Sequence, residues 1–138
     1  MIEITREPIS PERVVNKVKT DDSGCVVTYV GLIRQNSRGK KVLSVEYQDP
    51  AGTATSRLQE IADEARQKWT VENIAITHRI GKLQVGDINL VVAVASAHRQ
   101  EGFAASQYII DGFKRLIPTR KTETYQDGTT LVEGEQVE

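Results

Sequence analysis

The stretch LVVAVASAHRQEGF, residues 90–103, joins an apolar run to a helix-forming segment. Its first eight residues are small or apolar and rich in valine, which predicts a buried strand. His98 and Arg99 follow directly, where a helix over about residues 100–116 begins. Because the first N–H groups of a helix lack backbone partners, this junction favours a bound phosphate or carboxylate. The stretch therefore predicts a buried strand, a helix and a candidate anion site between them.

Outside this stretch, apolar patterning predicts an alternation of strands and helices. We expect strands at 2–5, 25–34, 42–48, 73–81 and 89–97, and helices at 10–19, 54–69 and 100–116. A further short strand is expected within 82–88, and an edge pair around the Asp127-Gly128 turn. The order of these elements predicts an α+β fold of two layers with a mostly antiparallel mixed sheet.

The segment from Cys25 to Gln48 predicts a local strand pair. Its two strands are too close in sequence for a parallel crossover, so we expect an antiparallel hairpin. The loop of this hairpin is rich in turn formers and positive charge; its basic residues are Arg38, Lys40 and Lys41. In the second strand, alternation predicts that Val42, Ser44 and Glu46 share one face, opposite Leu43, Val45 and Tyr47.

The composition is typical of one globular domain over residues 1–138, in which the tail from about residue 129 is expected to be flexible. A net charge of −1 suggests no general affinity for nucleic acid, and no apolar stretch approaches the roughly 20 residues that span a bilayer. The amino terminus shows no secretory leader, and the lone Cys25 excludes an intrachain disulfide and is expected in the core. We therefore expect a cytoplasmic protein.

Basic side chains stand at the ends of several predicted elements. Arg34 and the His98-Arg99 pair each follow an apolar strand, where a rigid scaffold holds side chains in place. Lys114 and Lys121 are seven residues apart, and Pro118 breaks the helix between them, so the chain can fold back and bring the two amines together. Taken singly, each of these charges is also consistent with a solvated surface residue.

Other chemical motifs are missing from the sequence. There is no P-loop, GxGxxG, GxSxG or HExxH pattern, and no cofactor or metal site is predicted. His78 has no carboxylate or cysteine at ligand spacing, so we interpret it as a structural or surface residue. The basic clusters are therefore the remaining candidates for chemistry.

Four segments taken together are specific to one family. They are VVTYVGLIR, THRIGKLQVGD, VAVASAHRQEGFAASQYIID and FKRLIPTRK, in that order and spacing. From about Gly24 to Glu123, the chain resembles the large, catalytic subunit of molybdopterin synthase. The resemblance implies an α/β hammerhead-type fold, a homodimer within a heterotetramer, and a small ubiquitin-like partner that ends in Gly-Gly.

The resemblance also implies a reaction and residues to perform it. The expected enzyme is a sulfurtransferase that converts cyclic pyranopterin monophosphate into molybdopterin, using sulfur from a thiocarboxylate at the partner's C-terminus. By motif position, Lys121 and Lys114 match the two active-site lysines, while Arg34, His98 and Arg99 match substrate-binding residues. The sequence departs from the family pattern at Thr119 and Arg120, where a bulky apolar residue and a tryptophan are usual.

Two other functions remain open from the residues. A non-catalytic module that binds anions or small molecules would use the same basic clusters, and the Thr119-Arg120 departure would fit an inactive paralogue. An RNA-binding domain is disfavoured, because aromatic residues make up only 5% of the chain and none interleaves with the basic ones for base stacking.

Overall fold

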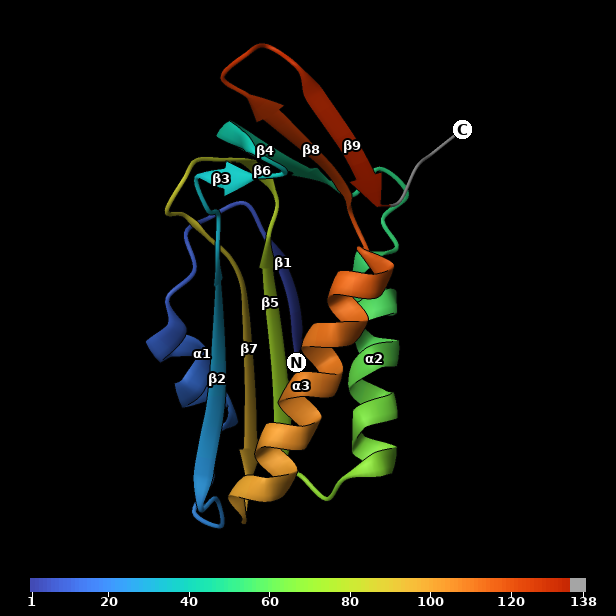
Figure 1. The fold of residues 1–138 in the computed structure, drawn as a ribbon. Helices are drawn as coiled ribbons and strands as arrows, with labels where there is room; N and C mark the ends of the chain where they lie inside the picture. Colours follow the sequence, from blue (N-terminus) through green and yellow to red (C-terminus); the bar gives the residue numbers. More distant parts are fainter. Residues whose placement is uncertain (135–138) are drawn as a thin grey trace.

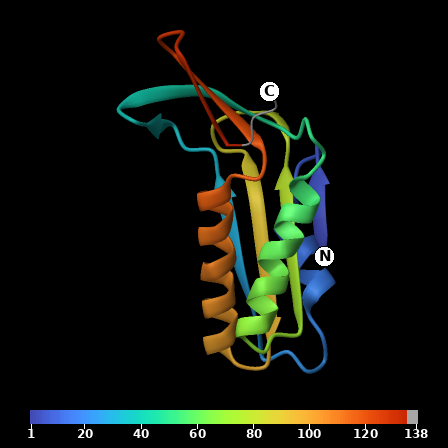
Figure 2. The same ribbon diagram turned by 90° about the vertical axis from the view of Figure 1, so that its right-hand side faces the viewer.

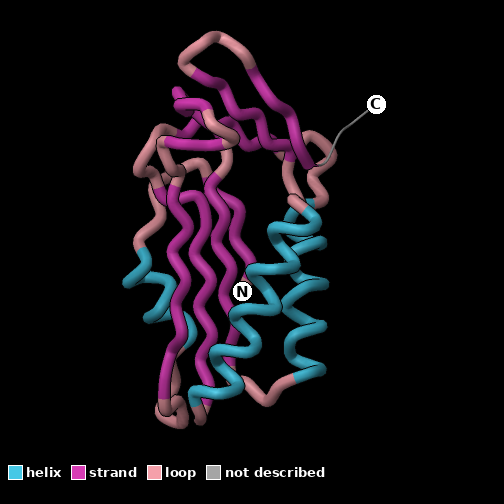
Figure 3. Tube along the Cα trace, in the orientation of Figure 1, coloured by secondary structure: helices cyan, strands magenta, loops and turns pink. Residues whose placement is uncertain are grey.

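The computed structural model describes residues 1–134 and contains two sheets and three helices in that range (Figures 1 and 3). The helices are α1 (Pro11–Val18), α2 (Ala54–Lys68) and α3 (Arg99–Leu116). The strands are β1 (Ile2–Thr5), β2 (Cys25–Leu32), β3 (Asn36–Ser37), β4 (Lys40–Gln48), β5 (Asn73–Arg79), β6 (Gly81–Leu83), β7 (Ile88–Ser96), β8 (Arg120–Tyr125) and β9 (Thr130–Gly134). The predicted α+β class is confirmed.

The first sheet has four strands in the order β1-β5-β7-β2. β7 is antiparallel to both of its neighbours, and β1 is parallel to β5. Helices α2 and α3 cover one face of this sheet, and α1 packs on the other (Figures 1 and 2). Alternate residues of β7 enter the two cores: Leu90 and Val92 face α2 and α3, whereas Val91 and Ala93 face α1. Burial on both faces explains why this strand reads as a continuous apolar run.

The second sheet lies across one end of the first (Figure 1). It has five strands, in which β3, β4, β8 and β9 follow one another and β6 also pairs with β4. Its buried side chains form a separate small core of Ile33, Val42, Val45, Tyr47, Leu83 and Tyr125. The chain thus buries apolar groups in distinct clusters, and the two sheets meet at the C-terminal end of α3.

The predicted hairpin between residues 25–34 and 42–48 is wrong. β2 pairs with β7 in the first sheet, and β4 pairs with β8 and β6 in the second. The turn at Arg38 and Gly39 instead closes a shorter hairpin between β3 and β4, with φ of 54° and 75° at these two residues. Positive φ at both central residues is the geometry that twists two strands together through a two-residue loop. Partner choice for the longer strands is set by distant segments.

The expected alternation along β4 holds within residues 42–44 and again within residues 45–47, but its phase changes between the two segments. Val42 and Ser44 are buried as a pair, but a register shift between them and the partner strand moves the phase, so that Val45 and Tyr47 are also buried. Leu43 is exposed. A bulge adds one residue to a strand and redirects the side chains that follow it. Val45 and Tyr47 are buried together as predicted, but the predicted grouping of Glu46 with Val42 and Ser44, and of Leu43 with Val45 and Tyr47, is wrong.

The two ends of the chain follow the local signals. Ser10 caps α1, since its Oγ accepts a hydrogen bond from the Arg13 N–H at 3.3 Å, and Pro11 occupies the first helical position. The expected pair around Asp127-Gly128 is confirmed as β8 and β9. Residues 130–134 of the predicted flexible tail form β9, and residues 135–138 lie outside the described residues. Among residues 1–134, none of the helices is long and apolar enough to cross a bilayer.

Candidate active site

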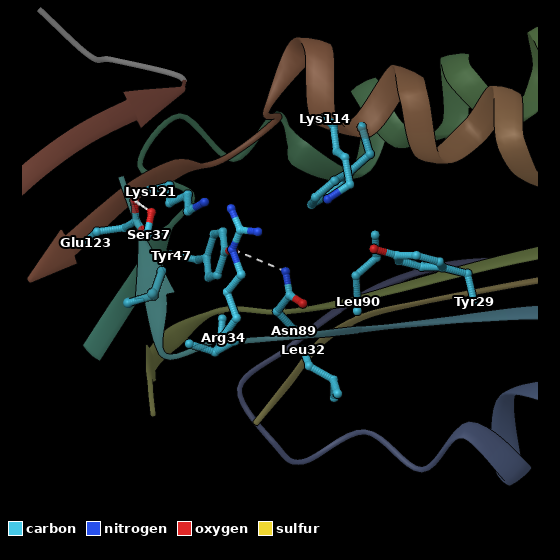
Figure 4. A pocket seen from close by; sticks show the side chains of 14 residues that line it. Tyr29, Leu32, Arg34, Ser37, Tyr47, Asn89, Leu90, Lys114, Lys121 and Glu123 are labelled. Atoms are coloured by element: carbon cyan, nitrogen blue, oxygen red, sulfur yellow. Dashed lines mark hydrogen bonds between the residues drawn. The ribbon is translucent and has the colours of Figure 1, made fainter. Parts of the chain in front are cut away.

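A pocket of about 360 Å³ opens where the two sheets meet the end of α3 (Figure 4). Small-molecule sites in proteins commonly start at about 300 Å³. The lining comes from β2 and the turn after it, β3, β4, β7, α3 and β8: Tyr29, Gly31, Leu32, Ile33, Arg34, Ser37, Val45, Tyr47, Asn89, Leu90, Phe113, Lys114, Lys121 and Glu123. An adjoining depression shares eight of these residues and adds Arg38, Ile117 and Glu133.

Three of the five predicted site residues line this pocket: Arg34, Lys114 and Lys121. Arg34 follows β2, Lys114 lies in the last turn of α3, and Lys121 is the second residue of β8. Figure 4 shows the three side chains around one space although they come from three elements. Within residues 1–134, none of them makes an ion pair. The pocket therefore offers unneutralised positive charge to an anionic ligand.

The chain reverses between Lys114 and Lys121, as the position of Pro118 predicts. α3 ends at Leu116, and the next residue, Ile117, caps it with a φ of 41° and a ψ of 82°, in the left-handed region. The Ile117 N–H still donates to the Phe113 carbonyl at 2.8 Å. β8 then starts at Arg120 and runs back beside β4, where Lys121 pairs with Tyr47. The reversal brings two lysines to one pocket that an unbroken helix would hold two turns apart.

A buried carboxylate lies beside the lysines, and the sequence analysis missed it. Glu123 is 5% exposed and accepts hydrogen bonds from the Ser37 and Tyr125 hydroxyls, each at 3.2 Å. Glu123 is two residues after Lys121 on one strand, so the two side chains share a face. That spacing was the available signal, but it required knowing that residues 120–125 form a strand. The site thus combines cations with one hydrogen-bonded acid.

The floor of the pocket is a polar pair from different sheets. The Asn89 side-chain amide of β7 donates to the Tyr47 hydroxyl of β4 at 3.1 Å (Figure 4). Burial raises the pKa of Tyr47 to about 12, and the Asn89 hydrogen bond opposes this rise only in part. Tyr47 therefore keeps its proton at neutral pH, and its O–H is available to donate to a ligand.

His78 lies under this floor, fully buried in β5, so of the two readings given for it, structural or surface residue, the surface one is wrong. Its Nδ1 is 2.8 Å from the Asn89 carbonyl oxygen, and its Nε2 is 3.1 Å from the Thr119 hydroxyl. Because a carbonyl only accepts, Nδ1 carries the proton and Nε2 accepts from Thr119. Burial lowers the pKa of His78 to about 4, so the ring is neutral at physiological pH.

His98 and Arg99 lie at the opposite end of α3 from the lysines. His98 is the N-cap of the helix and Arg99 its first residue; both are exposed and border a separate depression with Gly24 and Cys25. At about 1.5 Å of rise per residue, roughly 22 Å separates Arg99 from Lys114 along the helix. Within one chain, the predicted anion-binding pair of His98 and Arg99 therefore does not reach the lysine pocket.

Cys25 itself is half-buried, with its Sγ 3.5 Å from the Ser96 hydroxyl. In residues 1–134, no group of three or more histidine, cysteine, aspartate or glutamate side chains is arranged to hold a metal ion.

Comparison with known proteins gives one consistent result. The family model described as MoaE protein matches residues 4–116. The molybdopterin synthase catalytic subunit of Bacillus subtilis (strain 168) is 36% identical over 136 residues, which cover 99% of this chain and 86% of that protein. The human molybdopterin synthase catalytic subunit is 36% identical over 130 residues, which cover 94% of this chain and 69% of that protein.

A solved structure agrees with the sequence matches. The crystal structure of molybdopterin synthase from Staphylococcus aureus superposes with a TM-score of 0.88 at 34% identity, and the alignment covers 96% of each chain. The structural similarity therefore extends over nearly the whole chain.

Proposed function

Because this chain belongs to the MoaE protein family, we propose that it is the catalytic subunit of a molybdopterin synthase and that the lysine pocket is its active site. The observation that carries the proposal is the convergence of Arg34, Lys114 and Lys121 on one pocket, without ion-pair partners in the described chain. The substrate would be cyclic pyranopterin monophosphate, whose phosphate suits a site with three cations that make no ion pair within residues 1–134.

The sulfur would come from a second protein. The relatives are named catalytic subunits, which implies a further subunit in each assembly. We assign to that role a small ubiquitin-like carrier whose C-terminal Gly-Gly ends as a thiocarboxylate. Its sulfur forms a bond to a carbon of the pterin side chain, and a C–O bond of that carbon breaks, so that the oxygen leaves as water or stays on the phosphate. Water then hydrolyses the bond between the sulfur and the carrier's carbonyl carbon and supplies the oxygen of the carrier's carboxylate. Two such transfers give the dithiolene and leave two carrier carboxylates.

The pocket residues have separable roles in this reaction. Arg34 and Lys114 hold the anionic groups of substrate and carrier tail, while Lys121 transfers protons or captures the acyl group transiently when the thiocarboxylate reacts. Lys121 is suited to this because it lies on a strand beside Glu123, whose carboxylate is fixed by two hydrogen bonds. Tyr47 adds a neutral donor at the floor.

His98 and Arg99 are assigned to the same reaction through a second copy of the chain. β2 runs from Cys25, beside the His98 depression, to Leu32, beside the lysine pocket, and its outer edge has no strand partner within residues 1–134. Val30, Leu32 and Phe103 are exposed apolar side chains on or near this edge. Two chains joined about a twofold axis with antiparallel β2 edges would place His98 and Arg99 of each chain near the partner's pocket.

The direct test is reconstitution of the reaction. The purified chain is mixed with a thiocarboxylated Gly-Gly carrier and cyclic pyranopterin monophosphate, and dithiolene product is assayed. Product that disappears with Lys121→Ala supports the proposal. Binding of the carrier without turnover would support the alternative of a non-catalytic binding module.

The dimer arrangement has its own test. Arg99→Ala and Lys121→Ala chains are each assayed alone and then after random mixing. If each site takes Lys121 from one chain and Arg99 from the other, about one quarter of the sites in the mixture regain both residues. The substrate is kept well below KM, where Arg99→Ala alone is expected to retain about a tenth of wild-type activity or less. Recovery of the mixture toward a quarter of wild-type activity is then expected. No recovery above the average of the two separate variants would place both residues in one chain's site or remove Arg99 from it.

A further inference from the structure

The turn that joins the two pocket lysines is strained, so something must hold it. Ile117 is β-branched and has a φ of 41°, which typically costs about 1–3 kcal/mol and persists only when the surroundings enforce it. On one side, a Cβ at Gly134 would collide with the Thr119 carbonyl oxygen and with Ile117, so β9 packs closely against the turn. On the other side lies His78.

His78 contacts the neighbours of both lysines. Its ring packs edge-on against Phe113, the residue before Lys114, with centroids 5.1 Å apart. It also packs edge-on against Tyr47, the strand partner of Lys121, at 4.8 Å. Its Nε2 accepts from the hydroxyl of Thr119, two residues before Lys121, and both side chains are fully buried. One imidazole therefore touches the helix end, the turn and the strand that together position the two amines.

We propose that His78 is a positioning residue for the reaction: its hydrogen bond to Thr119 fixes the Ile117–Thr119 turn and so the placement of Lys114 and Lys121 relative to each other. This inference rests on the proposed function of the pocket. It also gives a role to Thr119, which departs from the bulky apolar residue usual for the family. In this chain a hydroxyl buried against an imidazole takes the place of apolar packing at that position.

The geometry predicts which kinetic parameter changes. Loss of the hydrogen bond leaves both lysines and their charges in the pocket, so substrate binding is largely kept. A displacement of about 1 Å in a catalytic group can lower the rate of the chemical step by about a hundredfold. Disturbance of the turn is therefore expected to lower kcat about tenfold or more and to change KM less than about threefold.

The test uses substitutions that remove the hydrogen bond from either side. Thr119→Val removes the hydroxyl at nearly constant volume, and Thr119→Ser keeps it. His78→Asn retains a donor for the Asn89 carbonyl but does not reach Thr119. Thr119→Val and His78→Asn are each expected to lower kcat, the double variant no further than the more damaging single one, and Thr119→Ser to recover most of it.

A matched control separates positioning from general loss of stability. Thr77 is the buried neighbour of His78 in β5, and its side chain faces α1 instead of the pocket. Thr77→Val makes the same chemical change there and is expected to keep the wild-type kcat. The inference is overturned if Thr119→Val keeps the wild-type kcat, or if Thr77→Val lowers kcat as much as Thr119→Val does.

A readout independent of turnover covers the case in which the proposed reaction itself fails. The lysine amines are dimethylated with ¹³C, and the signals of Lys114 and Lys121 are assigned with Lys→Arg variants. Thr119→Val is expected to shift both signals, whereas Thr119→Ser and Thr77→Val leave them in place. Unchanged signals in Thr119→Val would overturn the inference whatever the activity of the wild-type protein.

Discussion

The two ends of α3 carry similar charges in different surroundings. At its start, His98 and Arg99 are exposed and border an open depression. At its end, Lys114 joins Lys121 and Arg34 around a pocket whose floor is hydrogen-bonded across two sheets. Preorganised groups in a partly enclosed site contribute more to catalysis than the same groups in water. In the proposed function, the difference corresponds to catalysis at the C-terminal end of α3 and to substrate binding at its N-terminal end.

The largest effect that would test this division is expected at Lys121. Lys121→Ala should lower kcat by about 10² to 10³, because it removes the group assigned to proton transfer or acyl capture. Steady-state assay of dithiolene product measures this. The free energy of unfolding should change by less than about 0.5 kcal/mol. Lys82→Ala, at an exposed lysine of β6, is the control and should change neither quantity.

The next effect concerns the pH dependence of stability at the lysine end. Burial lowers the pKa of His78 to about 4, although the hydrogen bond that its ring donates to the Asn89 carbonyl and the charge of Asp49 both act to raise it. The unfolded chain binds a proton near the ordinary value of 6.5. The free energy of unfolding should therefore fall by up to about 3 kcal/mol between pH 6.5 and pH 4.

Urea unfolding at a series of pH values checks this expectation. His78→Gln should flatten the dependence in this window. His98→Gln changes the histidine at the exposed end of α3 and should keep the wild-type slope. An equal effect of the two substitutions would contradict the assignment of the slope to the buried ring.

A smaller effect is expected where β9 closes on the lysine turn. Gly134 has a φ of +88°, and an added Cβ would strike the Thr119 carbonyl oxygen. Gly134→Ala should lower the free energy of unfolding by about 2 kcal/mol, and it should also lower kcat. Gly128→Ala has the same φ of +88° but open space around it, so it isolates the backbone cost. Equal losses of stability for the two variants would show that contact with Thr119 is unimportant.

The smallest effect is expected at the open end of the helix. Arg99→Ala should raise the KM for the phosphorylated substrate about tenfold, as expected for a lost charge-assisted contact, and change kcat less than about threefold. Lys19→Ala, at an exposed basic residue beyond α1, is the control. If Arg99→Ala reduces kcat as strongly as Lys121→Ala does, the assignment of substrate binding to the start of α3 and of catalysis to its end is wrong.

Local signals were sufficient for much of the fold. The Ser10 cap and Pro11 predicted the start of α1, and the valine-rich run predicted β7, because these features act over a few residues. The partners of β2 and β4 were not predictable in this way. β2 pairs with β7, whose partner residues lie 56 to 71 positions further along the chain, and β4 pairs with β8, whose partner residues lie 72 to 83 positions further along. Short sequence separation favoured the wrong hairpin.

The residues of the candidate site fall into the same two groups: those that local sequence signals predict and those that depend on long-range strand pairing. Arg34, Lys114 and Lys121 were found from motif positions and from the break at Pro118. Asn89, Glu123 and the His78–Thr119 bond depend on which strands lie side by side, and on a bulge in β4 that resets the facing of Tyr47. The separation of His98 from the lysines follows from the length of α3 and could have been expected once the helix was assigned to residues 100–116.

The pocket takes its lining from both sheets, which are stabilised by separate apolar cores, and this has a consequence for how the pocket unfolds. Asn89 and Leu90 belong to β7, which is buried on both faces. Lys121 and Glu123 belong to the second sheet, whose buried apolar core has fewer residues. Segments with fewer buried contacts exchange their amide hydrogens through partial openings that leave the rest folded. Such an opening of β8 and β9 would dismantle the pocket while β7 stays protected. Mild denaturant should then abolish turnover before the first sheet loses its slow-exchanging amides.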